Sequence, residues 1–173
     1  GVSPFDIAQG IEIYDKKNYG EYVGEYLTVL ANKDPKIIAI TAAMTNGVGL
    51  SKFCNEYPSR FFDVGIAEEH ATTFAASLAI NKMKPYLFLY STFLQRSFDE
   101  LIHDVCMMNL PVKIMIDRAG IVGEDGCTHH GVFDLSYLSI MPNMTIVSPK
   151  CVSEIPFMLE FINEYNFPIA MRY

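Results

Sequence analysis

Polar and aromatic side chains follow three apolar runs of this sequence at the points where each predicted strand ends. In the first stretch, residues 63–70, Gly65 allows a tight turn and the carboxylates of Glu68 and Glu69 open a helix. Acidic residues in a first helical turn interact favourably with the helix dipole, so a structural role is the simpler interpretation. The alternative is a carboxylate that points over the strand ends, where ligands bind in open parallel sheets.

The second stretch, residues 90–96, is again a strand end followed by a helix start. Phe93 comes early in that helix, so we expect it near the loop side of the sheet, either as a core residue or beside a ligand. The helical spacing turns Arg96 away from Leu94 and Phe98, and the pattern alone predicts a solvated arginine.

The third stretch runs from Asp117 through a glycine-rich segment to residue 131. Arg118 follows a predicted strand and could clamp a phosphate through its fork of donors. Asp125, His129 and His130 could be metal ligands, but adjacent histidines tend to diverge and no further ligand set is visible. The pattern therefore favours hydrogen bonding or general acid–base work by one loop histidine, and no metal site.

The elements that must position these residues alternate between short apolar runs and longer helical patterns. Continuously apolar runs are typical of strands buried on both faces, and the alternation predicts an α/β fold. We expect a mostly parallel sheet of about six strands with helices on both faces. The predicted strands are 36–41, 60–64, 85–90, 112–117, 144–148 and 168–172.

Four helices are predicted, over residues 19–31, 67–80, 92–108 and 154–165. Alanines at four-residue spacing in 67–80 favour close packing against the sheet or a partner. Thr92 and Gln95 form a capping-box pattern, Ser153 is the expected N-cap of the last helix, and His103 should pair with Asp99 one turn away. The glycine-rich segment 118–143 is predicted to be a functional loop.

Composition excludes several classes of protein. The 173 residues are 50% hydrophobic and 19% charged, which favours one folded domain over a disordered chain. With 13 basic against 20 acidic residues the net charge is −7, which argues against nucleic-acid binding. We expect no membrane span and no signal peptide. The four cysteines form no C-x-x-C pair, which suits a reducing cytosol.

The three stretches resemble a known family of enzymes. Residues 62–71 are similar to the start of the pyrimidine-binding domain in transketolase-like thiamine diphosphate enzymes. Residues 90–96, 117–123, 125–131 and 133–138 narrow the resemblance to 1-deoxy-D-xylulose-5-phosphate synthases. The motifs occur in the family's order and cover nearly the whole chain. Alternatives are another enzyme of this type, such as a transketolase or a 2-oxoacid dehydrogenase β-type subunit, or a non-catalytic oligomerisation module.

The resemblance implies a transferase that condenses pyruvate with D-glyceraldehyde 3-phosphate, releases CO2, and feeds isoprenoid and thiamine biosynthesis. It implies that Glu68 is the catalytic carboxyl that hydrogen-bonds the cofactor's aminopyrimidine, a role that suits a neutral carboxyl in an apolar crevice. It also implies that Phe93 stacks on that ring and that His129 has a second catalytic role. The implied substrate-binding residues are Tyr90, Arg96, Arg118, Asp125 and His129, with Tyr90 and Arg118 on the aldehyde's phosphate.

The family's usual Gln is replaced here by Glu69, which we therefore expect to face away from Glu68. The resemblance also implies Mg²⁺, but the Gly-Asp-Gly motif that holds it is absent from this chain. We expect that motif in a preceding diphosphate-binding domain, and a C-terminal domain to follow. Residues 1–18 would be an interdomain linker and 19–173 the pyrimidine-binding domain of a homodimer, in which helix 67–80 is a candidate contact. A bacterial cytoplasm is the expected location, with a plastid as the alternative.

Overall fold

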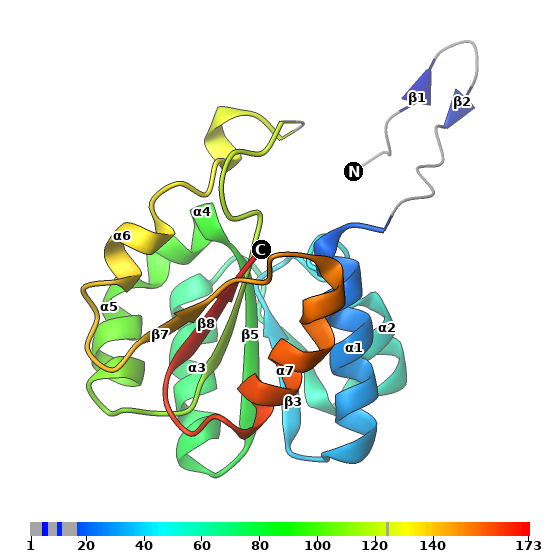
Figure 1. The fold of residues 1–173 in the computed structure, drawn as a ribbon. Coiled ribbons are helices and arrows are strands. Elements are labelled where there is room, and N and C mark those ends of the chain that lie inside the picture. The colour runs from blue at the N-terminus through cyan, green and yellow to red at the C-terminus, as the bar shows by residue number, and fades with distance from the viewer. Residues whose placement is uncertain (1–4, 7–9, 12–16, 124) are drawn as a thin grey trace.

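Six apolar runs form one parallel sheet, as predicted, in the computed structural model of the chain. The model describes residues 5–6, 10–11, 17–123 and 125–173. The strand order is β4-β3-β5-β6-β8-β7, and every neighbouring pair is parallel (Figure 1). The strands are β3 (Ile37–Thr41), β4 (Phe61–Asp63), β5 (Lys84–Tyr90), β6 (Lys113–Asp117), β7 (Thr145–Val147) and β8 (Ile169–Arg172).

Helices cover both faces of this sheet, which confirms the predicted fold class. Helix α1 (Tyr19–Lys33) and helix α7 (Ile155–Glu164) lie side by side on one face, where Tyr26 Oη donates to Glu160 Oε1 at 2.7 Å (Figure 1). Helix α3 (Glu68–Ile80) lies on the other face and packs against β5. Three further short helices are α2 (Ser51–Glu56), α4 (Ser91–Leu94) and α6 (Asp134–Leu138).

The helix predicted over 92–108 is broken, and its predicted capping box is wrong. After α4 come a 3₁₀ turn at Gln95–Ser97, the short α5 (Phe98–Glu100) and a π-helical segment at Leu101–Cys106. The Thr92 hydroxyl donates instead to the Thr128 carbonyl oxygen at 3.1 Å, and Gln95 Nε2 bonds the Thr92 carbonyl at 2.7 Å. A tertiary contact with the distant loop therefore takes the hydroxyl that the local pattern assigned to a cap.

Two other local predictions need correction. Helix α7 begins at Ile155 with Glu154 as its N-cap, and the Ser153 hydroxyl lies 3.1 Å from Cys151 Sγ instead of capping the helix. Segment 118–143 contains α6 and a 3₁₀ turn at Cys127–His129, neither of which was predicted. Both elements, like α2, are too short for a periodic apolar pattern to reveal.

The alanine face of α3 packs inside the fold, which is one of the two alternatives predicted from the alanine spacing. Ala71, Ala75, Ala76 and Ala79 of α3 are buried within the chain, so that alanine face is not available to a partner. The predicted local pair is also present, with His103 Nδ1 3.0 Å from Asp99 Oδ1.

The N-terminal segment is described only in part. Residues Phe5–Asp6 (β1) and Gly10–Ile11 (β2) pair as antiparallel strands. The remaining positions of the expected linker, apart from 17 and 18, lie outside the described residues. Asn18 caps α1 in a capping box with Glu21.

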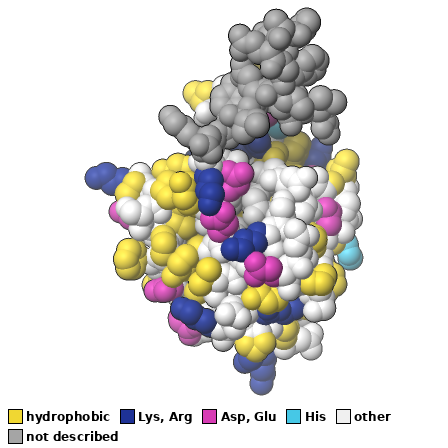
Figure 2. All heavy atoms as spheres, turned by 90° about the vertical axis from the view of Figure 1, so that its right-hand side faces the viewer, with side chains coloured by type: hydrophobic (Ala, Val, Ile, Leu, Met, Phe, Trp, Pro, Cys, Tyr) yellow, Lys and Arg dark blue, Asp and Glu magenta, His cyan; other side chains and the backbone are white. Residues whose placement is uncertain are grey.

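Charges of both signs share one face of the surface. Figure 2 shows Lys and Arg side chains interspersed with Asp and Glu on the side that carries α1 and α2, with no single basic patch on that face. Among the described helices, none is both long enough and apolar enough to cross a membrane.

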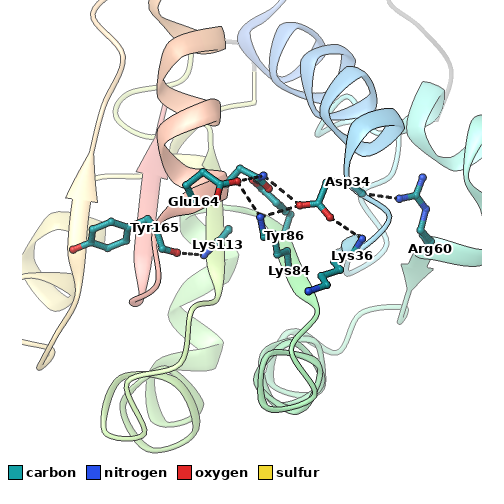
Figure 3. Close-up of polar contacts among 9 residues, drawn as sticks. Asp34, Lys36, Arg60, Lys84, Tyr86, Lys113, Glu164 and Tyr165 are labelled. Atoms are coloured by element: carbon teal, nitrogen blue, oxygen red, sulfur yellow. Dashed lines mark hydrogen bonds and ion pairs between the residues drawn. The ribbon is translucent and has the colours of Figure 1, made fainter.

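Polar side chains close the amino-terminal edge of the sheet, opposite the chemistry-bearing stretches (Figure 3). Lys84 Nζ lies 2.8 Å from Asp34 Oδ2 and 3.1 Å from Glu164 Oε1. Lys113, which is 1% exposed at the start of β6, donates to the main-chain carbonyl of Tyr165. Burial, and to a lesser extent the neighbouring charge of Lys84, lowers the pKa of Lys113 to about 8 against the opposing charge of Glu164.

Replacing Lys113 by Met tests this buried amine. An unfolded lysine has a pKa near 10.5, so unfolding takes up a proton between pH 8 and 10.5 and wild-type stability rises with pH there. Met does not titrate. The free energy of unfolding of wild type should therefore rise by about 1–2 kcal/mol relative to that of the variant between pH 7.5 and 9.5. Urea unfolding followed by circular dichroism at both pH values measures this change. If wild type and variant differ in unfolding free energy by the same amount at both pH values, the burial of a titrating amine is contradicted.

Candidate active site

The carboxyl ends of four neighbouring strands meet at one edge of the sheet. Parallel registers pair Thr41 with both Asp63 and Phe88, and Tyr90 with Asp117. The loops after β3, β4, β5 and β6 therefore start side by side. All three stretches singled out in the sequence arrive at this edge.

Asp63, a residue for which no role was predicted, stabilises the turn that leads into α3. Its Oδ1 accepts from the amides of Ala43 at 2.7 Å and Gly65 at 3.0 Å, and its Oδ2 accepts from the Thr45 hydroxyl at 2.9 Å. Ala43 and Gly65 both have positive φ, at 60° and 73°. One carboxylate thus stabilises two left-handed turns that bring the loops after β3 and β4 together.

Glu68 is the first residue of α3 and is 2% exposed, whereas Glu69 is exposed as expected. The Glu68 carboxylate borders a cavity of about 230 Å³, and its Oε1 accepts a hydrogen bond from Arg96 Nη1 at 2.8 Å. The interpretation of these acidic residues as helix-dipole partners is therefore incomplete, because one of them is buried at a cavity. The cavity is lined by Ala42, Ala43, Met44, Ile66, Glu68, Phe93 and Arg96.

Phe93, together with Ala43 and Met44, lines both this cavity and a second, more polar one of about 440 Å³. The ring centroids of Phe93 and Tyr90 lie 5.8 Å apart in a stacked arrangement. The His129 ring meets Phe93 edge-on, with a centroid distance of 5.5 Å. The second cavity is lined by Ala43, Met44, Thr45, Asn46, Gly47, Asp63, Tyr90 and Phe93.

Tyr90 contacts both the ring of Phe93 and the guanidinium of Arg118. The Arg118 guanidinium carbon is 4.1 Å from the centroid of the Tyr90 ring, and Arg118 Nε donates to Asp125 Oδ2 at 2.6 Å. Burial raises the pKa of Tyr90, against the opposing effect of Arg118, which keeps the hydroxyl a donor at neutral pH. Arg118 Nη1 is buried and has no hydrogen-bond partner in the described part of the chain, so this donor is available to an anion.

The orientation of Arg118 depends on Asp117, another residue for which no role was predicted. Arg118 adopts φ of 56°, a conformation that is uncommon for a non-glycine residue, and its amide donates to Asp117 Oδ1 at 2.7 Å. Asp117 is 8% exposed, and burial raises its pKa to about 6 although the Arg118 amide and charge both oppose the shift. Its place at a strand end, one residue before an arginine, is the signal that could have indicated this role.

The loop that carries Asp125 and His129 is fastened to the strand ends. Gly120 and Gly131 exchange two main-chain hydrogen bonds of 2.8 and 2.7 Å. The Val122 amide donates to His130 Nδ1 at 3.2 Å, so His130 holds the loop while His129 faces Phe93. Among the described residues, no three His, Cys, Asp or Glu side chains are grouped as metal ligands would be.

All seven residues named as candidate site residues belong to one connected set of contacts. Two ion pairs, Glu68–Arg96 and Arg118–Asp125, lie at its ends. Phe93 links them, because Arg96 lies over its ring at 5.3 Å and Tyr90 and His129 contact it. Arg96 is half exposed, in line with the helical pattern, but its Nη1 also pairs with the buried carboxylate of Glu68, which the pattern did not predict.

This fold and site define an α/β domain with a ligand site at the carboxyl edge of a parallel sheet. A family model described as the transketolase pyrimidine-binding domain matches residues 15–173. The chain belongs to this family.

Two synthases resemble the chain over its whole length. The 1-deoxy-D-xylulose-5-phosphate synthases of Clostridium perfringens strain SM101 and Clostridium kluyveri are 55% and 52% identical to it. The chain spans 28% of the length of each of these relatives. It therefore corresponds to their pyrimidine-binding part.

Two solved structures share the fold. A transketolase from Campylobacter jejuni has a TM-score of 0.81 at 20% identity, over 89% of this chain and 25% of that one. A split-gene transketolase, described as an inactive β4 tetramer, has a TM-score of 0.79 at 28% identity. That match covers 89% of this chain and 50% of the other.

Replacing Gly47 by Ala tests the position of Tyr90. A Cβ at Gly47 would lie 1.9 Å from the Tyr90 hydroxyl oxygen, so the rigid ring must shift from its place. We expect a loss of about 1–3 kcal/mol in the free energy of unfolding, as is typical of overpacking. Gly123→Ala is the matched control, because a Cβ there meets nothing within 4 Å. Equal stability of the two variants would show that Tyr90 does not need the space at Gly47.

Proposed function

We propose that this chain is the pyrimidine-binding domain of a thiamine diphosphate-dependent 1-deoxy-D-xylulose-5-phosphate synthase. The whole enzyme would condense pyruvate with D-glyceraldehyde 3-phosphate. The observation that carries the proposal is the buried Glu68 carboxylate, which shares a cavity with the Phe93 ring. Relatives that are 52–55% identical over the full chain bear the synthase name, which supports this choice over other enzymes of the same fold.

The side chains of the smaller cavity fit the aminopyrimidine ring of thiamine diphosphate. Glu68 offers a hydrogen-bonding carboxyl at a site 2% exposed, and Phe93 offers an aromatic face for stacking. Ala42 and Ala43 leave room for a flat ring between the loops. The diphosphate and its Mg²⁺ would be held outside residues 19–173, in the preceding domain that the family resemblance implies. The preceding residues, 1–18, would form the linker from that domain.

When bound, thiamine diphosphate supplies the carbanion chemistry, and the protein positions and polarises it. Glu68 would bind the aminopyrimidine and move a proton at its carboxyl oxygen, with Phe93 holding the ring in place. Arg118 and Tyr90 would bind the phosphate of the aldehyde, since Arg118 Nη1 is a buried donor free of internal partners in the described chain. Asp125 would orient that guanidinium through its 2.6 Å bond to Nε.

Arg96 and His129 would handle the carboxylate of pyruvate and the hydroxyl groups or protons of the reaction. Both contact Phe93, so both lie beside the position proposed for the reactive ring. The His129 Nδ1 and the Thr128 hydroxyl oxygen are 2.9 Å apart, which fixes the orientation of the imidazole and leaves Nε2 for a ligand. The assembled enzyme would be a homodimer with a further C-terminal domain.

The direct test uses the complete protein that carries this chain. It is incubated with thiamine diphosphate, Mg²⁺, pyruvate and D-glyceraldehyde 3-phosphate, and products are identified by NMR. Formation of 1-deoxy-D-xylulose 5-phosphate supports the proposal. Decarboxylation of pyruvate without that product would indicate another acceptor, and failure to bind the cofactor would favour a non-catalytic module.

Changing Glu68 to Gln or Ala should remove most turnover. Loss of one positioned proton-transfer group costs roughly 10²–10⁴-fold in rate, so we expect kcat to fall by at least about a hundredfold. Glu69→Gln is the matched control, because this neighbouring carboxylate is exposed, and it should keep nearly full activity. Steady-state kinetics on folded variants decides the matter, and wild-type turnover in Glu68→Gln would remove Glu68 from the catalytic role.

Changing Arg118 to Ala should act mainly on the phosphorylated substrate. Loss of a bidentate cation should raise the KM for D-glyceraldehyde 3-phosphate by about 10- to 100-fold while the KM for pyruvate changes little. Arg118→Lys keeps the charge without the planar fork, and an intermediate KM is expected. A larger effect on pyruvate than on the aldehyde would reverse the substrate assignment.

A further inference from the structure

The guanidinium of Arg96 holds two groups at once. Its Nη1 donates to Glu68 Oε1 at 2.8 Å, and its central carbon lies 5.3 Å from the centroid of the Phe93 ring. Arg96 comes from the 3₁₀ turn at Gln95–Ser97, the first break in the helical segment after β5. One side chain therefore links the end of β5 to the start of α3 across the mouth of the smaller cavity.

These two groups are the ones that the proposed function assigns to the cofactor's aminopyrimidine. A flat ring that enters the cavity between Glu68 and Phe93 meets the carboxylate oxygen and the aromatic ring that the guanidinium already contacts. A guanidinium is itself flat, donates hydrogen bonds in its plane and stacks on aromatic faces. Arg96 thus makes the same two kinds of contact that the ring would make, so the guanidinium and the ring compete for Glu68 Oε1 and for the Phe93 ring.

The balance of forces allows Arg96 to leave only when another donor arrives. The Glu68 side chain is 3% exposed, and a buried carboxylate without a hydrogen-bond partner is strongly disfavoured. The Arg96 side chain is 50% exposed, and its pairing with Glu68 is its one hydrogen bond within the described residues. Water can solvate the guanidinium when it leaves, whereas Glu68 needs a replacement donor, which an aminopyrimidine provides.

We propose that Arg96 is a placeholder for the aminopyrimidine, released when the ring binds. This inference rests on the proposed function and adds an order of events to it. The released guanidinium lies beside Phe93, which also lines the larger cavity with Tyr90. It can then pair with an anionic substrate there, so cofactor binding creates the cationic partner of the pyruvate carboxylate. Arg96 acts on the cofactor through Glu68 and in this respect is a positioning residue.

The test measures cofactor and substrate binding separately in the complete protein. The dissociation constant of thiamine diphosphate, with Mg²⁺ and without substrate, is determined by calorimetry for wild type, Arg96→Ala and Arg96→Lys. A displaced pair of this exposure contributes about threefold to tenfold in binding, so Arg96→Ala should bind the cofactor tighter by that factor. The KM for pyruvate should rise at least about tenfold in the same variant. Arg96→Lys should fall between wild type and Arg96→Ala in both quantities.

These opposite changes separate a placeholder from a residue that merely supports the fold, because a damaged site would bind both ligands more weakly. Arg60→Ala is the matched control: Arg60 lies at the opposite edge of the sheet and donates to the carbonyls of Ala31 and Asp34 (Figure 3). It should leave the cofactor constant within about twofold of wild type.

The melting temperature provides a second measurement that does not need turnover. Arg96→Ala should melt below wild type without cofactor, because Glu68 loses its partner, and the gap should close at saturating cofactor. Wild type that binds the cofactor as tightly as Arg96→Ala, or more tightly, overturns the placeholder and leaves the proposed function standing. Absence of cofactor binding in wild type overturns both.

Discussion

Parallel pairing of β5 with both β3 and β6 is the constraint on which the site depends. It places the carboxyl ends of these strands at one edge, so loops that are distant in sequence start within a few residues of one another in register. Glu68, Phe93 and Arg118 each follow a different strand, and a strand that ran the opposite way would carry its residue to the other edge of the sheet. Burial of the strands on both faces enforces this arrangement, since the middles of β3, β5 and β6 are almost fully excluded from water.

Charge pairing then sets the details within that frame. Two arginines lie at this edge of the sheet, and each pairs with a carboxylate: Arg96 with Glu68 and Arg118 with Asp125. The aromatic rings of Phe93 and Tyr90 lie between the two pairs and carry a cation each. The result is a site in which Phe93 lines both a small cavity that contains Glu68 and a larger, more polar cavity beside Tyr90, which suits a heteroaromatic cofactor beside an anionic substrate.

Much of this arrangement could be predicted from the sequence, because strand burial and parallel order leave clear apolar runs. The six strands, the face of α3 and the edge at which the three stretches meet all follow from such patterns. The broken helix after β5 could not be predicted, since the Thr92 hydroxyl is used by the distant Thr128 carbonyl and not by its own helix. The roles of Asp63 and Asp117 were hidden for the same reason: each carboxylate bonds backbone amides whose conformation only the folded chain shows.

The pairing of Arg96 with Glu68 likewise could not be predicted from helical periodicity, because a periodic pattern describes only one element. This pair joins the 3₁₀ turn after β5 to the start of α3, and the proposed mode of cofactor binding depends on it. A crystal structure of the complete protein with thiamine diphosphate and Mg²⁺ tests that account most directly. The account predicts the aminopyrimidine hydrogen-bonded to Glu68 and stacked on Phe93, with Arg96 turned away. An aminopyrimidine bound elsewhere, with the Glu68–Arg96 pair intact, would contradict it.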